Sequence, residues 1–182
     1  MKLTKTSFEG LFILEPTILK DDRGFFMESH NQKQLEALGI ASTFVQDNHS
    51  LSRKGVIRGL HFQNPPHQQT KLIRSISGEI LDVVVDIRKK SLTYGEHFSI
   101  ILSANNARQL FVPPGFAHGF AALTNNAEIL YKCDQFYHKN AEGGLPYNDP
   151  NLKIDWQLDQ SEIIISDKDK VHPAFKGFQS QF

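Results

Sequence analysis

The stretch from Glu79 to Arg88 reads EILDVVVDIR, and its alternation decides the fold class. Four aliphatic residues share one face of an extended strand: Leu81, Val83, Val85 and Ile87. Asp82 and Asp86 fall on the opposite face. The stretch therefore predicts a β-strand with an aliphatic face.

Similar runs lie on both sides of this stretch. They predict further strands at Leu11–Leu14, Gly55–Gln63, Lys71–Ser77, Glu96–Ser103, Arg108–Val112 and Ala127–Tyr137. The good helix signal is Gln32–Leu38, which Asn31 can cap and Gly39 can end, and one helical turn is expected near Asp159–Glu162. Many short strands, with turns every ~8–12 residues, indicate an all-β sandwich or barrel, without separating a jelly roll from other barrels.

Composition narrows the class of protein. The chain has 182 residues, of which 40% are hydrophobic, and we expect one domain spanning residues 1–182. Lys and Arg number 20 and so do Asp and Glu, so no basic excess indicates nucleic acid or anionic lipid as partner. Cys133 is the only cysteine, which excludes an internal disulfide framework. No signal peptide or membrane-spanning run is visible, so a cytoplasmic protein is expected.

The segment Arg58–Gln63, RGLHFQ, carries the first candidate chemistry. On a straight strand Arg58 and His61 would point to opposite faces. A glycine within a strand often marks a bulge, and a bulge at Gly59 would bring both side chains to one side. The simpler alternative is a half-buried histidine that only packs in a sheet.

The segment Pro113–Phe120, PPGFAHGF, carries the second, with His118 beginning the next strand. Its Pro-x-Gly-x-x-His spacing resembles the second motif of cupins, which are small jelly-roll barrels. A metal-binding cupin also offers His-x-His and a glutamate in its first motif, but here Gln63 stands where the second histidine would be and no glutamate follows until Glu79. Because an amide is a weak ligand for transition metals, no metal site is expected.

Taken together, these segments resemble one family, the dTDP-4-dehydrorhamnose 3,5-epimerases. The matching stretches, in order and spacing, are Asp22–Phe26, Gln46–Ser50, Arg58–Gln63, Lys71, Val85–Arg88, Pro114–Phe120 and Tyr131-Lys132. The resemblance implies a cupin-like jelly roll with minor short helices, active without metal or cofactor. It also implies a homodimer in which the partner lends an N-terminal segment to the site. The implied isomerase converts dTDP-4-dehydro-6-deoxy-D-glucose to dTDP-4-dehydro-L-rhamnose by inverting C3′ and C5′.

Removal of a proton beside a ketone needs a base, a group that stabilises the enolate and an acid on the opposite face of the sugar. His61 suits the base, because an imidazole pKa of ~6.5 lies close to working pH. By resemblance, Lys71 stabilises the enolate, Tyr131 donates the proton and Asp169 pairs with the histidine. Asp167 is a nearby rival for the last role, and the sequence leaves that choice open.

The other matching positions are implied to hold the nucleotide. Arg23 and Arg58 would face the pyrophosphate, whose oxygens suit a guanidinium fork. Phe25 and Phe26 would supply an aromatic surface for the thymine. The remaining implied ligand positions are Glu28, Gln46, Asp47, Asn48, His118, Glu142 and Lys168.

Three alternatives stay open at this point. A 3-epimerase, which inverts one centre of a dTDP-4-keto-6-deoxysugar, would share the same histidine and tyrosine. A metal-dependent cupin oxygenase is a different class, and Gln63 argues against it. A non-catalytic cupin that binds sugar nucleotides would not need His61, Lys71 and Tyr131 together.

Overall fold

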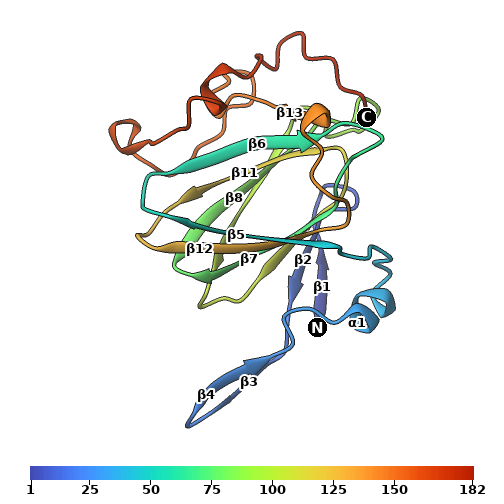
Figure 1. Cartoon of the computed structure of the whole chain (residues 1–182), viewed down its shortest axis with the longest axis vertical. Coiled ribbons are helices and arrows are strands. Elements are labelled where there is room, and N and C mark those ends of the chain that lie inside the picture. The colour runs from blue at the N-terminus through green and yellow to red at the C-terminus, as the bar shows by residue number, and fades with distance from the viewer.

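The computed structural model describes residues 1–182. The chain folds into two facing β-sheets (Figure 1). The six-stranded sheet has the order β1 (Lys2–Lys5), β2 (Phe12–Glu15), β10 (Gln109–Val112), β7 (Lys71–Ser77), β12 (Ala127–Cys133) and β5 (Gln46–Ser52). The five-stranded sheet has the order β13 (Glu142–Gly144), β6 (Ile57–Gln63), β11 (Phe116–Ala122), β8 (Glu79–Asp86) and β9 (His97–Ser103). This arrangement confirms the predicted all-β, cupin-like fold.

The remaining elements are short. Strands β3 (Ile18–Asp21) and β4 (Gly24–Met27) form a hairpin that projects away from the two sheets (Figure 1). One α-helix, α1 (Gln32–Ala37), and three 3₁₀ turns complete the chain: η1 (Lys139–Ala141), η2 (Gln160–Glu162) and η3 (Asp169–Val171). The turn η2 confirms the helical turn expected near Asp159–Glu162. No helix has the length and apolar character needed to cross a membrane.

Strand β8 is buried on both faces, which goes beyond the single aliphatic face that the sequence predicts. Its inward residues, such as Ile80 and Val84, pack in the core between the sheets. The outward aliphatic residues pack under the C-terminal segment, with Leu152 and Trp156 among their neighbours. Asp82 and Asp86 share the inward face with Ile80 and Val84, so both are completely buried instead of facing solvent. The aliphatic face is the outer one, and it is buried because irregular chain after β13 covers it.

Helix α1 begins and ends where the sequence places its signals. The Asn31 side chain accepts a hydrogen bond from the Gln34 backbone N–H at 3.2 Å, which satisfies one free donor of the first turn. The helix ends at Ala37, one residue earlier than predicted, and Gly39 follows with φ +85°. Leu35 packs with residues on the outer face of the six-stranded sheet.

Two strand predictions need correction. The strand beginning at Ala127 ends at Cys133 instead of Tyr137, because the Asp134 carboxylate, in place of a backbone carbonyl, accepts a 2.6 Å hydrogen bond from the Thr70 backbone N–H. Strand β11 starts at Phe116, before the predicted start at His118. The sequence analysis also misses β1, β5, β13 and the β3–β4 hairpin. In β5, alternate residues are part-buried but polar, so no hydrophobic alternation marks the strand.

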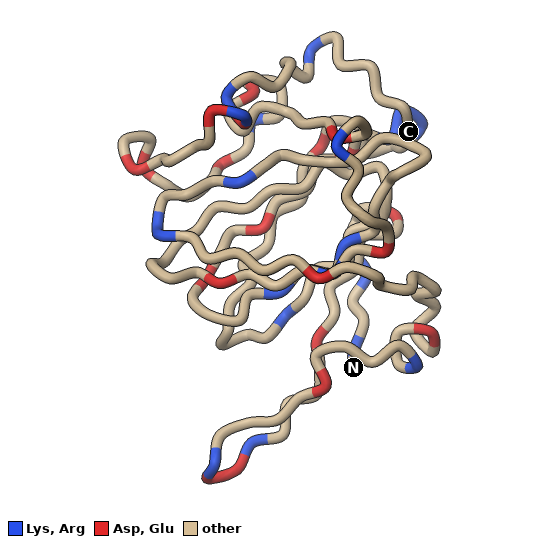
Figure 2. Tube along the Cα trace, in the orientation of Figure 1, with Lys and Arg blue, Asp and Glu red and all other residues tan.

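Charged residues of both signs are spread over the fold, including the tip of the hairpin and the C-terminal segment (Figure 2). No element carries a continuous run of one sign. This mixture agrees with the formal net charge of zero. Recognition of a charged ligand must therefore come from particular side chains inside a cavity.

Candidate active site

Strand β6 carries the predicted bulge. Across the β6–β11 pair, His61 lies opposite His118 and Arg58 lies opposite Phe120, so β6 has one extra residue between these pairs. Gly59 adopts φ +126°, and a Cβ there would collide with the backbone of Gly119. The bulge turns both Arg58 and His61 toward the space between the sheets.

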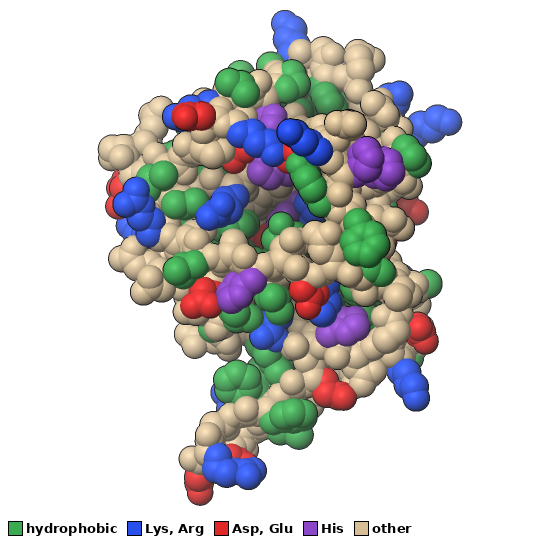
Figure 3. Space-filling model, in the orientation of Figure 1, with side chains coloured by type: hydrophobic (Ala, Val, Ile, Leu, Met, Phe, Trp, Pro, Cys, Tyr) green, Lys and Arg blue, Asp and Glu red, His purple; other side chains and the backbone are tan.

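That space opens into a cavity of about 600 Å³. Its lining residues are Asn48, His49, Ser50, Val56, Ile57, Arg58, His61, Lys71, His118, Phe120, Tyr131, Ile164, Ile165, Ser166, Lys168 and Asp169. Figure 3 shows the hollow, with histidine, lysine and arginine side chains gathered around it. A pocket of about 150 Å³ adjoins it, and both share Asn48, His61, Lys71 and Tyr131. Three of the four predicted catalytic residues therefore lie at one junction.

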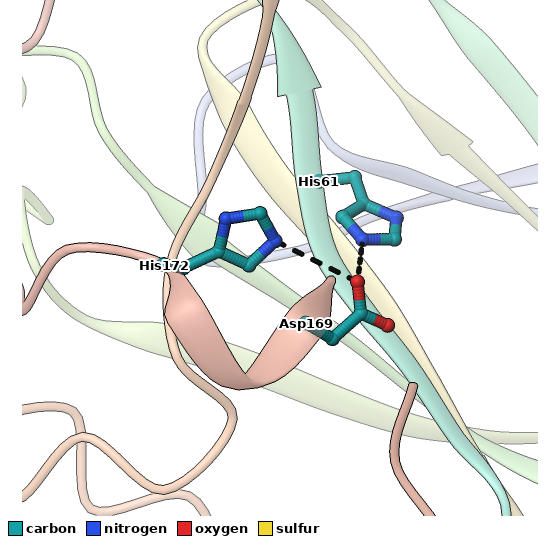
Figure 4. Close-up of side chains that lie close together, drawn as sticks. All are labelled: His61, Asp169 and His172. Carbon is teal, nitrogen blue, oxygen red and sulfur yellow. Dashed lines mark hydrogen bonds and ion pairs between the residues drawn. The ribbon is translucent and has the colours of Figure 1, made fainter. Parts of the chain in front are cut away.

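His61 is paired with Asp169 (Figure 4). Its Nε2 lies 2.6 Å from Oδ1 of Asp169, whose side chain is only 5% exposed. Burial opposes ionisation of this carboxyl, but the hydrogen bond and charge of His61, together with hydrogen bonds from Gly59 and Ser166, outweigh burial and hold the pKa of Asp169 below its usual range. An ionised carboxylate only accepts hydrogen bonds, so Nε2 carries the proton and Nδ1 is the unprotonated nitrogen of neutral His61.

The geometry also decides between the two candidate aspartates. Asp167 has a 99% exposed side chain, and its nearest ionic partner is Lys170 at 2.9 Å. Asp169 sits in η3, where its backbone N–H donates to Ser166 Oγ at 3.1 Å. The histidine partner is therefore Asp169, held by a hydrogen-bonded turn.

Lys71 and Tyr131 come from neighbouring strands, β7 and β12. The Lys71 Nζ lies 6.0 Å from the centre of the Tyr131 ring. Burial lowers the pKa of Lys71. The negative charges of Asp82 and Glu142 act in the opposite direction, but their effect is smaller. Burial raises the pKa of Tyr131, so its phenol stays neutral at neutral pH. The junction thus offers a lysine amine and a phenol beside an oriented imidazole.

Comparison with known proteins then identifies the family. The family model described as dTDP-4-dehydrorhamnose 3,5-epimerase matches residues 5–177. The dTDP-4-dehydrorhamnose 3,5-epimerase of Shigella flexneri is 49% identical over 170 residues, which cover 93% of this chain and 93% of that protein. The chain belongs to the dTDP-4-dehydrorhamnose 3,5-epimerase family.

Solved structures of epimerases share its fold. The Bacillus anthracis dTDP-4-dehydrorhamnose 3,5-epimerase, with TDP and PPi bound, is 48% identical with a TM-score of 0.93, covering 96% of this chain and 99% of that one. The Legionella pneumophila 3,5-epimerase, in complex with dTDP-4-keto-L-rhamnose, is 47% identical with a TM-score of 0.88, covering 92% and 89%. Both matches extend over almost the whole chain.

The structure of this family member brings most of the predicted binding residues to the two pockets. Arg58, Asn48, His118 and Lys168 line the larger cavity. Gln46 and Glu142 line the smaller pocket, together with Asn48. Asp47 points the other way along β5 and pairs with Lys132 at 2.8 Å outside both pockets.

Besides Asp47, four predicted binding residues lie outside both pockets. Arg23, Phe25 and Phe26 belong to the projecting hairpin, where the Arg23 guanidinium pairs with Asp21. Glu28 follows the hairpin and accepts hydrogen bonds from the side chains of residues 31 and 34, beside α1. None of the four lines the cavity formed by its own chain.

Sequence reasoning misses Tyr137, which lines the smaller pocket. Its hydroxyl donates to Glu142 Oε2 at 2.9 Å, and that hydrogen bond raises the pKa of Tyr137. Lys168 donates to the other oxygen of Glu142 at 2.5 Å. Burial opposes ionisation of Glu142, but these two hydrogen bonds, together with the charges of Lys168 and His61, outweigh burial and lower the pKa of Glu142. In the sequence, Tyr137 lies at the end of a predicted strand. That prediction gives no indication that Tyr137 belongs to the loop after β12 and lines a pocket.

Gln63 also has a role that the sequence does not reveal. Its Nε2 donates to the His67 carbonyl at 2.6 Å, and its Oε1 accepts from the His138 backbone N–H at 2.6 Å. The rings of His67 and His138 stack with their centres 3.8 Å apart. Gln63 therefore ties together the two loops beside the smaller pocket.

Proposed function

We propose that this chain is an isomerase that converts dTDP-4-dehydro-6-deoxy-D-glucose to dTDP-4-dehydro-L-rhamnose by inverting C3′ and C5′. The observation that carries the proposal is the meeting of His61, Lys71 and Tyr131 at the junction of two pockets. The three come from three strands, so the rigid sheets fix their relative positions. The named activities of the family members described above support the same reaction.

The reaction begins with His61. Asp169 accepts a hydrogen bond from the Nε2–H of His61. This hydrogen bond fixes the tautomer and leaves the Nδ1 lone pair to remove the proton from the carbon beside the C4′ ketone. As the ring becomes positively charged, the ionised Asp169 stabilises it, as in other histidine–aspartate pairs. Nε2 keeps its proton throughout, and Nδ1 holds the proton that has left the sugar.

Lys71 stabilises the enolate that forms. Its ammonium would face O4′, where negative charge develops, and a single well-placed donor of this kind is worth about 3 kcal/mol. Burial makes the interaction stronger, because a low-dielectric site screens charge less than water does. The same burial lowers the pKa of Lys71, so the ammonium is maintained over a narrower pH range than in an exposed lysine.

Tyr131 returns a proton on the opposite face of the sugar. A base alone can only return the proton to the face that it left, so inversion requires a second group. The raised pKa of Tyr131 keeps the phenol protonated and ready to donate. Repetition at the second carbon requires the sugar to present C3′ and then C5′, or the reverse, to the same groups.

The nucleotide is held in the larger cavity. Arg58 is oriented by a hydrogen bond from its Nε to Ser52 Oγ at 3.1 Å. A guanidinium fixed in this way suits the pyrophosphate. Asn48, His118 and Lys168 provide further polar contacts along the lining.

We propose that the active unit is a homodimer in which the β3–β4 hairpin enters the partner's site. Leu19, Phe25 and Phe26 are each more than 60% exposed on a hairpin that packs on neither sheet (Figure 1). A lone two-stranded hairpin is marginally stable in water. In the partner's cavity, Arg23 would meet the pyrophosphate and the two phenylalanines the thymine. Asp47 and Glu28 would then act at the edge of this shared site.

We place the enzyme in the cytoplasm and treat residues 1–182 as one domain. The free thiol of Cys133 is buried, as suits a reducing compartment. The C-terminal segment supplies Asp169 to the histidine of β6. Neither part would hold the pair without the other.

Reaction in deuterium oxide tests the proposed function. The dTDP-linked 4-keto sugar should acquire deuterium at both C3′ and C5′, as followed by proton NMR. Label at C3′ alone would reassign the chain as a 3-epimerase. Label at neither position would exclude an epimerase.

A Tyr131→Phe variant separates inversion from proton removal. It keeps the ring and its packing but removes the hydroxyl, so His61 and Lys71 still form the enolate. Exchange should continue with retention, while inversion falls much further, most clearly at C5′. Inversion of both centres at the wild-type rate would show that Tyr131 only packs. Loss of exchange as complete as in a His61→Ala variant would show that the hydroxyl helps to form the enolate.

A further inference from the structure

A second histidine lies against the catalytic pair. Nε2 of His172 is 3.6 Å from Oδ1 of Asp169, and the rings of His172 and His61 meet edge to face with centres 5.6 Å apart (Figure 4). His172 directly follows the η3 turn, in which residues three apart lie on the same side. The turn therefore presents Asp169 and His172 together toward His61.

The position of His172 is tightly enclosed. Its side chain is 12% exposed, and its Nε2 is buried without a hydrogen-bond partner. A Cβ at Gly144 would collide with the ring, so only glycine leaves room for it. A buried nitrogen without a partner costs free energy, and nothing in the proposed epimerisation uses this one.

The cluster matches the preferred ligands of zinc. One ligand atom from each of His61, Asp169 and His172 lies within 4.8 Å of the others. Two imidazole nitrogens and one carboxylate oxygen, with a fourth position open to solvent, form a known type of zinc site. The pair formed by His118 and Asp82 has a similar hydrogen bond but no third donor in the cluster.

We propose that His61 Nε2, Asp169 Oδ1 and His172 Nε2 form an inhibitory binding site for Zn²⁺. Tetrahedral ligands at ~2.0–2.1 Å from zinc lie about 3.3 Å from one another. The His172–Asp169 distance of 3.6 Å is already close to this value, and the 2.6 Å His61–Asp169 contact has to widen. Rotation of the His61 ring or of the carboxylate provides that change.

Inhibition follows from the location of the ring proton. Zinc takes the lone pair of His61 Nε2, so the proton that Nε2 carried moves to Nδ1 of the same neutral ring. Nδ1 then has no lone pair with which to accept a proton from the sugar. The step requires no redox change, and removal of zinc restores the original tautomer. The inhibition rests on the proposed function, whereas the binding of zinc does not.

Calorimetric titration of the chelator-treated protein with ZnCl₂ tests the site directly. We expect one zinc per chain, and a His172→Gln variant should bind it at least about tenfold more weakly. Glutamine keeps a polar side chain in the enclosed space but offers only a weak ligand. Co²⁺, titrated in the same way, should give the visible absorption of a tetrahedral site in the wild type and lose it in the variant. A His172→Ala variant repeats the test if the glutamine variant fails to fold.

A His138→Ala variant is the matched control, because His138 is an exposed histidine in the stacked pair with His67. Its zinc affinity should equal that of the wild type. Equal affinity in the wild type and both His172 variants, or loss of binding only in His138→Ala, would overturn the proposed site. Deuterium exchange, compared with each variant's own zinc-free rate, should be inhibited at a zinc concentration that shifts with the measured affinity. Zinc binding through His172 without any epimerase activity would refute the proposed function alone.

Discussion

The molecule contains two histidine–aspartate pairs that face each other across the β6–β11 strand pair. His61 and His118 are direct neighbours in register, and each uses Nε2 to contact a carboxylate. The His61 side chain is 31% exposed, whereas that of His118 is 8% exposed. Asp169 comes from a turn 108 residues away, whereas Asp82 comes from the adjacent strand β8.

This difference in exposure and in contacts shows how the same pair of residue types can serve either proton transfer or structural support. Nε2 of His118 contacts both oxygens of Asp82, at 3.1 and 3.0 Å, and the ring is buried inside a continuous sheet. His61 is held by a single carboxylate oxygen on the cavity wall. We therefore expect His61 to transfer protons, and His118 to bind the nucleotide and support the structure of the site.

The largest effect should come from His61→Ala. Without the imidazole, exchange at C3′ and C5′ should fall by at least the ~10²–10⁴-fold typical of a positioned acid–base group. Affinity for dTDP, measured by calorimetry, should stay within a few-fold of the wild type, because the nucleotide contacts remain. The matched variant His118→Ala should weaken binding but retain exchange. The reverse pattern would show that the base has been assigned to the wrong histidine.

The next largest effect should come from Asp169→Asn. An amide can donate to Nε2, which would place the ring proton on Nδ1 and remove the lone pair that acts as base. Turnover should fall by about 10²-fold or more, within the range for a lost acid–base group. Asp167→Asn, on the exposed neighbour, should leave turnover unchanged. A fall in Asp167→Asn alone would reverse the choice of carboxylate.

These pairs also show what the sequence can predict. The aliphatic alternation around β8 predicts the sheet, and Gly59 within a strand pattern predicts the bulge that turns Arg58 and His61 inward. Both are local features, because strand periodicity and glycine conformation act over a few residues. The pairing of Asp169 with His61 spans 108 residues, so only the family resemblance suggests it, and that left Asp167 open.

Other features have no local signal at all. Strand β5 turns polar residues such as Gln46 and Asn48 inward, because there the space between the sheets is a cavity instead of a core. The sequence of β5 is therefore as polar as that of a loop, and its residues give no strand signal. Tyr137 and His172 reach the site only because irregular segments fold back over β6 and β13. Such contacts depend on tertiary packing and not on the pattern of neighbouring residues.

The pH dependence of the exchange rate tests Lys71 independently of the two histidine–aspartate pairs. Burial lowers the pKa of Lys71, so its ammonium, and with it the stabilised enolate, is lost as pH rises through a value below the ~10.4 of an ordinary lysine. Burial raises the pKa of Tyr131, so the phenol is still protonated there. The rate of exchange should therefore fall on the alkaline side below pH ~10.4. Lys71→Arg, whose guanidinium stays charged above pH ~12, should lower the rate but remove this alkaline limb. An unchanged limb would assign it to another group.

Removal of metal should change the reaction rate less than any of the substitutions at His61, Asp169 or Lys71. Gln63 is occupied by the two loops that it joins, and an amide is a weak ligand. Treatment with EDTA should therefore leave the rate unchanged in metal-free buffer. In zinc-contaminated buffer it should raise the rate. Stoichiometric bound metal, with activity lost on its removal, would contradict a metal-free reaction.

Among the variants of the two histidine–aspartate pairs, the smallest effect on turnover should come from Asp82→Asn, although its effect on stability should be clear. The amide keeps the shape of the side chain and one hydrogen bond to His118, but it loses the charge and the second acceptor. Because the Asp82 side chain is fully buried, an imperfectly satisfied polar group should cost about 1–3 kcal/mol of unfolding free energy. Thermal unfolding should show this as a lower Tm, while exchange in deuterium oxide stays within about tenfold of the wild type, well short of the loss assigned to a positioned acid–base group. An Asp82→Asn variant with normal Tm and exchange reduced as far as in Asp169→Asn would mean that His118 also moves protons. The two pairs would then be equivalent in function, and the difference in their burial would no longer distinguish catalysis from support.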